Sequence, residues 1–168
     1  MSENYKTKKT QTLVLMGLYT ALVTSVTLFT SIQYSAGGYF NLGDVVVLLL
    51  AAITPFRQAL VAASLGSMIA DVLASAVHYA VFTGIIKGLM VVAVVLLNKF
   101  LSTKAFFVPF LVASLVMLGG YALVDGFILG GYSAVASLVA NLAQGVLGAL
   151  ISTLIYPFAK KLNTYLKG

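Results

Sequence analysis

Three side chains that can hold a polar ligand recur every four residues in one apolar stretch, HYAVFTGIIKGLMVVAVVLL, which runs from His78 to Leu97. They are Tyr79, Thr83 and Lys87, and this spacing places them on one face of a helix. A phenol, a hydroxyl and an ammonium offer donors of different geometry beside an aromatic surface. The face therefore suits a small polar ring compound, although an interfacial tyrosine and a threonine that packs between helices would explain these two residues equally well.

Lys87 requires an explanation, because an ammonium near the centre of a membrane helix costs about 2.5 to 3.5 kcal/mol on insertion scales. No acid lies within seven residues of it, and apart from Glu3 the acids are Asp44, Asp71 and Asp125. One interpretation is a polar pocket in which one of these aspartates is the counterion. The others are a structural ion pair that fixes helix register, or a lysine that snorkels to the outer headgroups.

Two later segments add polar pairs at helical spacing. Tyr121 and Asp125 are four residues apart, and Asn141 and Gln144 are three apart, so each pair shares a helix face. An amide both donates and accepts, which is useful for reading a heteroaromatic edge, although hydrogen bonding between helices explains the amides equally well. With the possible counterions of Lys87 included, the candidate ligand-binding residues are Asp44, Asp71, Tyr79, Thr83, Lys87, Tyr121, Asp125, Asn141 and Gln144.

The composition is that of an integral membrane protein. Of 168 residues, 61% are hydrophobic and 8% are charged, whereas a soluble domain has about 25% charged residues. No run is long enough for a separate soluble domain. We therefore expect one membrane-embedded domain, residues 1–168, with a basic cytoplasmic N-terminal segment at 1–10.

Several chemistries are disfavoured by what the chain lacks. It has no cysteine and one histidine, which excludes thiol chemistry and disfavours a metal cluster. It has no phosphate-binding loop and no intramembrane protease motif. We expect a protein that is not an enzyme and that has no cofactor or metal of its own.

Six apolar segments predict an all-α integral membrane protein with six transmembrane helices. They lie at about 11–32, 42–54, 57–75, 80–98, 105–129 and 134–158. The second is short for a span. Lysines before the first segment resemble a signal peptide, but about 20 apolar residues favour an uncleaved helix.

The basic residues predict the orientation. Nine of the ten Lys and Arg residues lie at the two termini or in alternate connections, and the loops near 33–41, 76–79 and 130–133 have none. The positive-inside rule makes the basic side, with both termini, cytoplasmic. The net charge of +6 therefore reflects topology and not nucleic-acid binding. The intramembrane acids, Lys87 and the amides then share the outer half of the membrane.

The segment before the second helix contains QYSAGGYF and then NLGD. The aromatic, glycine-rich loop can act as a lid that stacks on a ligand, or as an interfacial aromatic belt. Asn41 is expected to cap the second helix, with Asp44 as the reciprocal acid of a capping box.

The first helix carries Gly17, Ala21 and Ser25 four residues apart. Small residues at this spacing let another helix approach closely. Periodicity leaves open whether that helix belongs to this chain or to a partner.

The block NLGD … SMIADVL … HYAVFTGIIKG, the six short helices and the small-residue strip resemble the substrate-binding S components of energy-coupling factor (ECF) vitamin transporters. The resemblance covers nearly the whole chain. It is closest to the subgroup for hydroxymethylpyrimidine, a thiamine precursor, or for vitamin B6 forms such as pyridoxine. His78, within this block, joins the candidate ligand-binding residues.

The resemblance implies a high-affinity vitamin-binding subunit in the bacterial cytoplasmic membrane. Such a subunit docks on an EcfT-type transmembrane coupling protein that carries two ATPase subunits, and these partners hydrolyse the ATP. The family's docking pattern on the first span corresponds to Gly17, Ala21 and Ser25, with glycine in place of the first alanine. A stand-alone proton-coupled secondary transporter, with Asp71, Asp125 and Lys87 as a relay, is the alternative.

Overall fold

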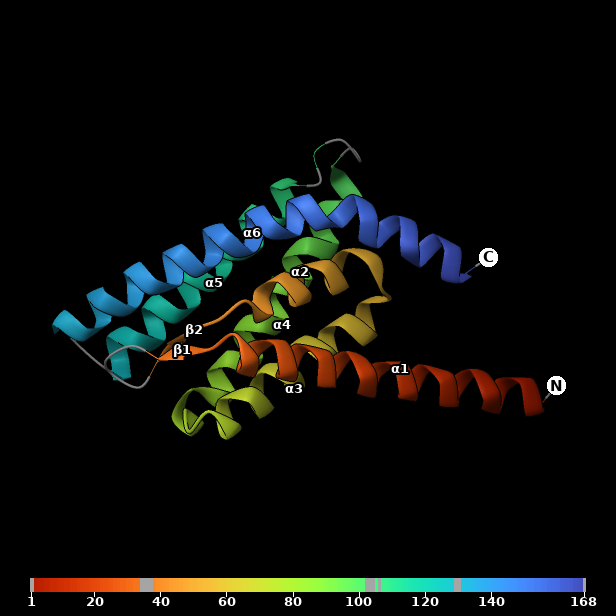
Figure 1. The fold of residues 1–168 in the computed structure, drawn as a ribbon, viewed down its shortest axis with the longest axis horizontal. Coiled ribbons are helices and arrows are strands. Elements are labelled where there is room, and N and C mark those ends of the chain that lie inside the picture. Colours follow the sequence, from red (N-terminus) through yellow and green to blue (C-terminus); the bar gives the residue numbers. More distant parts are fainter. Residues whose placement is uncertain (1, 34–37, 102–104, 106, 129–130, 168) are drawn as a thin grey trace.

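The computed structural model describes residues 2–33, 38–101, 105, 107–128 and 131–167. In these residues the chain forms six helices and one short hairpin (Figure 1). In chain order the elements are α1 (Ser2–Phe29), β1 (Ile32–Gln33), β2 (Tyr39–Phe40), α2 (Gly43–Ile53), α3 (Phe56–Leu73), α4 (Val77–Phe100), α5 (Phe107–Ile128) and α6 (Gly131–Lys167).

The predicted all-helical architecture is confirmed for the described residues. All helices except α2 are long and apolar enough to cross a membrane. Their outward faces carry large apolar side chains such as Leu65, Ile85 and Leu115, as expected for surfaces that contact lipid. The 11-residue α2 is only about 16 Å long, so the number of complete spans and the side on which the termini lie stay predictions.

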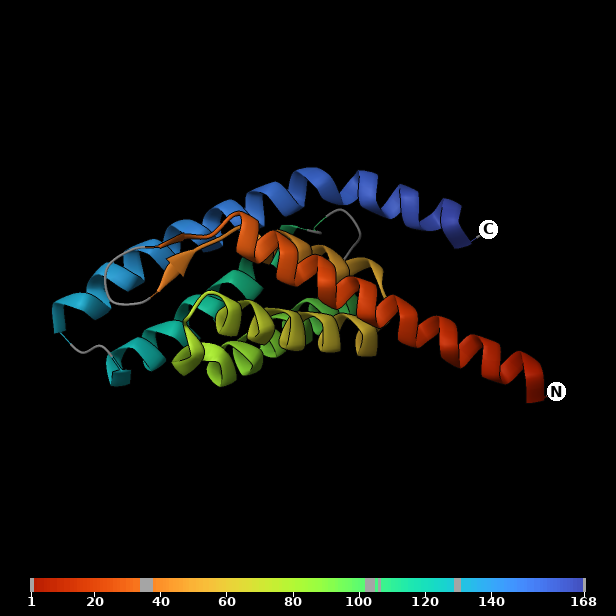
Figure 2. The ribbon, with the colours of Figure 1, turned by 60° about the horizontal axis from the view of Figure 1, so that its bottom comes forward.

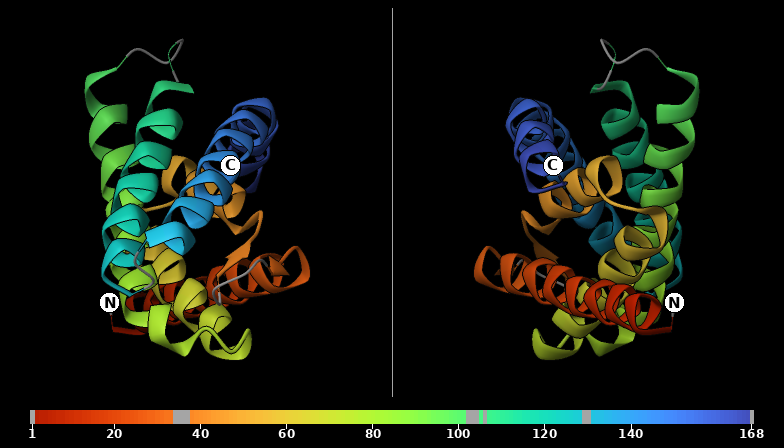
Figure 3. Two further views of the ribbon diagram at one scale, coloured as in Figure 1. Left: turned by 90° about the vertical axis from the view of Figure 1, so that its left-hand side faces the viewer. Right: turned by 90° about the vertical axis from the view of Figure 1, so that its right-hand side faces the viewer.

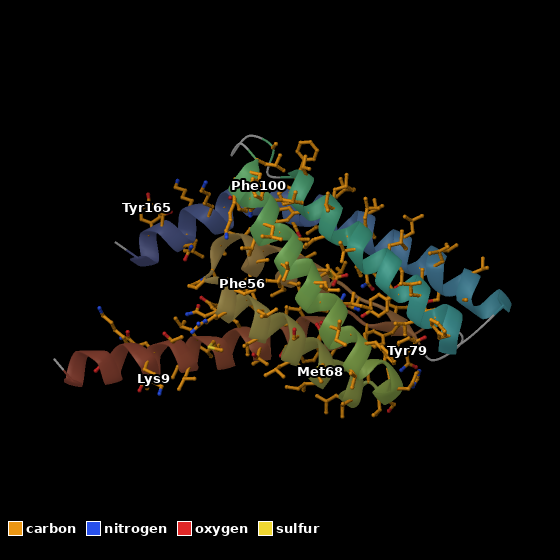
Figure 4. All side chains as sticks on the ribbon, turned by 180° about the vertical axis from the view of Figure 1, so that it is seen from behind. Lys9, Phe56, Met68, Tyr79, Phe100 and Tyr165 are labelled. Carbon is orange, nitrogen blue, oxygen red and sulfur yellow. The ribbon has the colours of Figure 1, made fainter. Side chains whose placement is uncertain are left out.

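Two helices are longer than their apolar segments. α1 begins at Ser2, and α6 continues past Pro157 to Lys167, because no further proline or glycine interrupts the polar residues at either end. Figures 1 and 2 show these two ends projecting from the same end of the molecule. In Figure 4, Lys9 and Tyr165 lie at that end, whereas Tyr79 lies at the opposite one.

The short helix α2 is the centre of the apolar core. Its sequence GDVVVLLLAAI is apolar on every side because α1, α3, α4 and α6 all pack against it. Leu48 is completely buried and belongs to one cluster with side chains from the surrounding helices. That cluster includes Val23, Val47, Ala62, Met90, Val94, Phe110 and Met117.

α1 lies at the edge of the bundle, away from α5 and α6 (Figure 3). It packs on α3, where the backbones approach closely at Gly66. Thr24 Oγ1 donates to the Gly66 carbonyl oxygen at 2.8 Å, and a Cβ at Gly66 would lie 2.8 Å from the Thr20 carbonyl oxygen. Such small-residue contact is the usual basis of helix association in lipid.

The connection between α1 and α2 differs from the expected loop. Ile32 pairs with Phe40 and Gln33 pairs with Tyr39 in an antiparallel hairpin, and residues 34–37 lie outside the described part. This hairpin carries Tyr39 toward the interior of the bundle.

The predicted capping box is wrong. The residue before α2 is Leu42, which makes no side-chain cap. Asn41 Oδ1 does accept a hydrogen bond from the Gly43 N–H at 2.9 Å. Asp44 does not return to Asn41, because its carboxylate is turned into the bundle, toward Lys87.

Gly66→Ala should destabilise the protein, because the added methyl group meets the α1 backbone and cannot displace it cheaply. We expect a loss of about 1 to 3 kcal/mol of stability, measured as a lower melting temperature in detergent. Gly17→Ala is the matched control, since a Cβ at Gly17 would have no neighbouring atom within 4 Å and alanine favours the helix. Equal melting temperatures for the two variants would contradict the close α1–α3 approach.

Candidate functional site

A polar cavity lies among the helices, with about 450 Å³ of empty space including its open mouth. Its wall combines three phenols with hydroxyl, amide, carboxylate and ammonium groups. The lining residues come from α1, the hairpin segment, α3, α4, α5 and α6, and are Thr27, Gly38, Tyr39, Asn41, Ser67, Asp71, Tyr79, Thr83, Lys87, Tyr121, Asp125, Ser137, Asn141 and Gln144.

Lys87 finds its counterion on α2. Its Nζ donates to Asp44 Oδ1 in a salt bridge that is almost fully buried. The same ammonium lies 3.6 Å from the Met117 sulfur and 5.4 Å from the centroid of the Tyr121 ring. A charge-assisted hydrogen bond and a cation–π contact thus offset the desolvation of the lysine.

Gln144 completes this ion pair from α6. Its Nε2 donates to Asp44 Oδ2 at 2.7 Å, so both carboxylate oxygens are bonded. Its Oε1 accepts from the backbone N–H of Asn41 at 2.8 Å and from Asn41 Nδ2 at 3.3 Å. One amide side chain therefore joins the start of α2, the exit of the hairpin and α6.

A second cluster surrounds Asp125 on α5. Tyr79 donates its hydroxyl to Oδ1 at 2.8 Å. Ser137 donates to Oδ2, and Asn141 Nδ2 lies 3.4 Å from the same oxygen. Both oxygens of this buried carboxylate are therefore bonded by protein donors, as buried acceptors require.

The third acid, Asp71 on α3, faces the hairpin. Tyr39 donates its hydroxyl to Asp71 Oδ1 at 2.5 Å. Burial raises the pKa of Tyr39, and the nearby Asp71 carboxylate raises that pKa further, so the phenol keeps its proton and acts as a donor. On the same wall, Tyr121 donates to Thr83 Oγ1 at 3.1 Å.

Most of the predicted ligand-binding residues lie together. Eight of the ten line the cavity, namely Asp71, Tyr79, Thr83, Lys87, Tyr121, Asp125, Asn141 and Gln144. Figure 4 shows Tyr79 at the end of the bundle where α4 begins. Asp44 is buried behind the wall and reaches the cavity only through Lys87 and Gln144. His78 is exposed at the start of α4 and does not line the cavity.

Six lining residues were absent from the predicted set: Thr27, Gly38, Tyr39, Asn41, Ser67 and Ser137. Helical spacing could have found two of them, since Ser67 is four residues before Asp71 and Ser137 is four before Asn141. The hairpin residues carry no such periodic signal.

The small-residue strip on α1 lies outside the site. Gly17, Ala21 and Ser25 are all exposed, whereas Val23 and Thr27 on the other side of the helix are buried. Packing within the described chain therefore does not account for the strip.

The cavity has the chemistry of a binding site. In the described residues no group of three or more His, Cys, Asp and Glu side chains could hold a metal ion. Hydrogen-bond donors and acceptors on five helices and the hairpin segment instead surround the cavity, an arrangement that suits a small polar molecule.

A bundle of apolar helices around one polar cavity is the architecture of a membrane protein that handles a small solute. Residues 7–163 match the family of the ECF-type riboflavin transporter, S component, and the chain belongs to this family. It is 30% identical over 156 residues, 92% of this chain and 90% of the relative, to the thiamine precursor transporter HmpT of Lactococcus lactis subsp. cremoris (strain MG1363). The predicted resemblance to S components is thus confirmed, and both comparisons describe transport proteins, not enzymes.

Lys87→Met should strongly destabilise the protein, because Asp44 would stay buried without its cation. Breaking a buried pair in this way costs about 3 to 5 kcal/mol. The double variant Lys87→Met/Asp44→Asn removes both charges and should recover much of that loss, since the new amide oxygen can still accept from Gln144. The melting temperatures in detergent of Lys87→Met, Asp44→Asn and the double variant measure the coupling between the two residues. If the loss in the double variant equals the sum of the two single losses, the pair does not act as a unit.

Proposed function

We propose that this chain is the vitamin-binding subunit of an ATP-driven ECF importer, with hydroxymethylpyrimidine or a B6 form such as pyridoxine as its ligand. The single observation that carries this proposal is the polar cavity within the bundle of an S-component family member. ATP is hydrolysed by two partner ATPase subunits, since this chain has no nucleotide-binding motif.

The cavity suits a ligand with an aromatic ring. Tyr39, Tyr79 and Tyr121 provide aromatic surfaces, and the Tyr79 and Tyr121 rings meet edge to face with centroids 6.5 Å apart. The 30% identity to a protein named as a thiamine precursor transporter supports a ligand with a single ring.

Ligand identity can be tested with the purified protein. Mass spectrometry of the copurified ligand, followed by titration calorimetry with hydroxymethylpyrimidine, pyridoxine and riboflavin, should show tight binding of one of the two single-ring vitamins. Calorimetry is suitable because the chain has no tryptophan for a fluorescence signal. Tight binding of riboflavin alone would contradict the proposed ligand class.

The docking surface in this proposal is the small-residue strip of α1, with an EcfT-type coupling protein as the partner. Gly17, Ala21 and Ser25 are exposed on an apolar helix that uses its other face to pack on α3. Backbone-to-backbone contact needs such a surface, because lipid provides little hydrophobic drive for helix association. The cavity lies on other faces of the bundle, so binding and docking are separable.

Ala21→Trp should abolish ATP-driven uptake and copurification with the coupling protein, while vitamin binding to the isolated subunit survives. The indole would hold the two helices apart and remove many small van der Waals contacts. Leu115→Trp on α5 is the matched control, because Leu115 is also exposed and lies on a helix that packs on α4 and α6. A variant that assembles normally but loses its ligand would refute the docking assignment.

A second candidate function is a stand-alone proton-coupled transporter. The observation that favours it is the gathering of three buried aspartates and Lys87 around one cavity. Vesicles that contain only this protein separate the two functions. Accumulation of vitamin driven by a proton gradient would support the secondary transporter, whereas binding without concentrative uptake supports the ECF subunit.

A further inference from the structure

One acceptor in the cavity wall has no hydrogen-bond partner in the part of the chain that the structure describes. Asp71 is 3% exposed and lines the cavity, and its Oδ1 is bonded by Tyr39. Its Oδ2 is buried and has no hydrogen-bond partner among the described residues. A buried carboxylate oxygen without a donor is costly, and more so than a neutral acceptor.

The other acids of the cavity region are already compensated. Asp44 is held by Lys87 and Gln144. Asp125 accepts hydrogen bonds from Tyr79 and from two groups of α6, Ser137 and Asn141. Asp71 differs from both in that its Oδ2 has no partner within hydrogen-bond distance among the described residues, although the Thr83 hydroxyl, Lys87 and His78 lie near enough to interact with the carboxyl group.

The charges around the cavity are also unbalanced. The buried ionisable acids are Asp44, Asp71 and Asp125, and the buried cation among the described residues is Lys87. Lys87 donates to Asp44, and His78 on the outer face of α4 is exposed. With the carboxylates ionised, the region would hold an excess of negative charge, which a cation can offset at short range.

We propose that Asp71 is the residue that selects the ligand, by accepting through Oδ2 a hydrogen bond from a protonated ring nitrogen. This inference rests on the proposed function and narrows its substrate class to ring compounds with a basic nitrogen. A charge-assisted N–H···O bond to Asp71 would give Oδ2 a direct donor and place a positive charge beside this carboxyl group, which forms no salt bridge among the described residues. Tyr39 then acts as the positioning residue, because its hydroxyl holds Oδ1 and thereby orients Oδ2.

This chemistry distinguishes the candidate vitamins. The aminopyrimidine of hydroxymethylpyrimidine and the pyridine of pyridoxine each have a ring nitrogen that can take up a proton. The isoalloxazine of riboflavin stays neutral near pH 7. Asp71 thus provides a chemical reason for this chain to prefer the single-ring vitamins.

The test pairs a variant with a ligand analogue. The binding affinities of hydroxymethylpyrimidine and pyridoxine are each compared with that of a benzene analogue, in which CH replaces every ring nitrogen. The affinities are measured for the wild-type protein and for the variants Asp71→Asn and Asp71→Glu. In wild type we expect the nitrogen ring to bind at least about tenfold more tightly than its analogue. Asp71→Asn should weaken binding of the nitrogen ring by about 10- to 100-fold and binding of the analogue by less than about threefold.

The analogue serves as the control for folding, because an intact cavity still binds it. Asp71→Glu keeps the charge and should retain part of the preference for the nitrogen ring. An equal loss for both ligands in Asp71→Asn, or no loss for either, would overturn the role of Asp71 while the proposed function stands. Wild-type protein that binds riboflavin and neither single-ring vitamin would overturn the proposed substrate class itself. If Asp71→Asn does not fold, a wild-type protein without preference for the nitrogen ring is enough to refute the inference.

Discussion

The buried ion pair between Lys87 and Asp44 is the interaction around which the rest of the bundle is arranged. An ammonium in an apolar helix is tolerated only where a carboxylate and further polar groups surround it. Asp44 meets this need at the first turn of α2, so α2 must begin inside the bundle and not at its surface. Gln144 then joins the pair to α6 and to Asn41. The position of one charge thus constrains α2, α4, α6 and the end of the hairpin.

The same constraint creates the space for a ligand. Because α2 begins inside the bundle, polar side chains of α1, of the hairpin segment and of α3 to α6 surround a cavity beside its first turn. The apolar core lies on the other side of the ion pair, in the cluster around Leu48 and Met90. The same helices therefore contribute polar side chains to the cavity and apolar side chains to the core.

Much of this could be predicted from the sequence, because the signals are local. Apolar segments longer than about 18 residues indicate membrane helices. The segment of α2 was recognisable as too short for an ordinary span. The face with Tyr79, Thr83 and Lys87 follows from a spacing of four, since residues one helical turn apart point the same way. Side chains that are polar within an apolar helix must face the interior, so eight of the cavity-lining residues could be selected without a structure.

The pairings between helices could not be predicted, because they depend on how distant segments meet. Spacing left three aspartates as equal counterions for Lys87, and the contact with α2 selects Asp44, 43 residues away. The capping motif at Asn41 was misleading because a long-range partner outcompetes the local hydrogen bond that Asp44 could have made. Tyr39 reaches Asp71 through a hairpin that has no periodic signal, and the free oxygen of Asp71 exists only in the assembled cavity. Sequence periodicity specifies which face of a helix is polar, whereas packing specifies which polar groups satisfy one another and which one is left without a hydrogen-bond partner among the described residues.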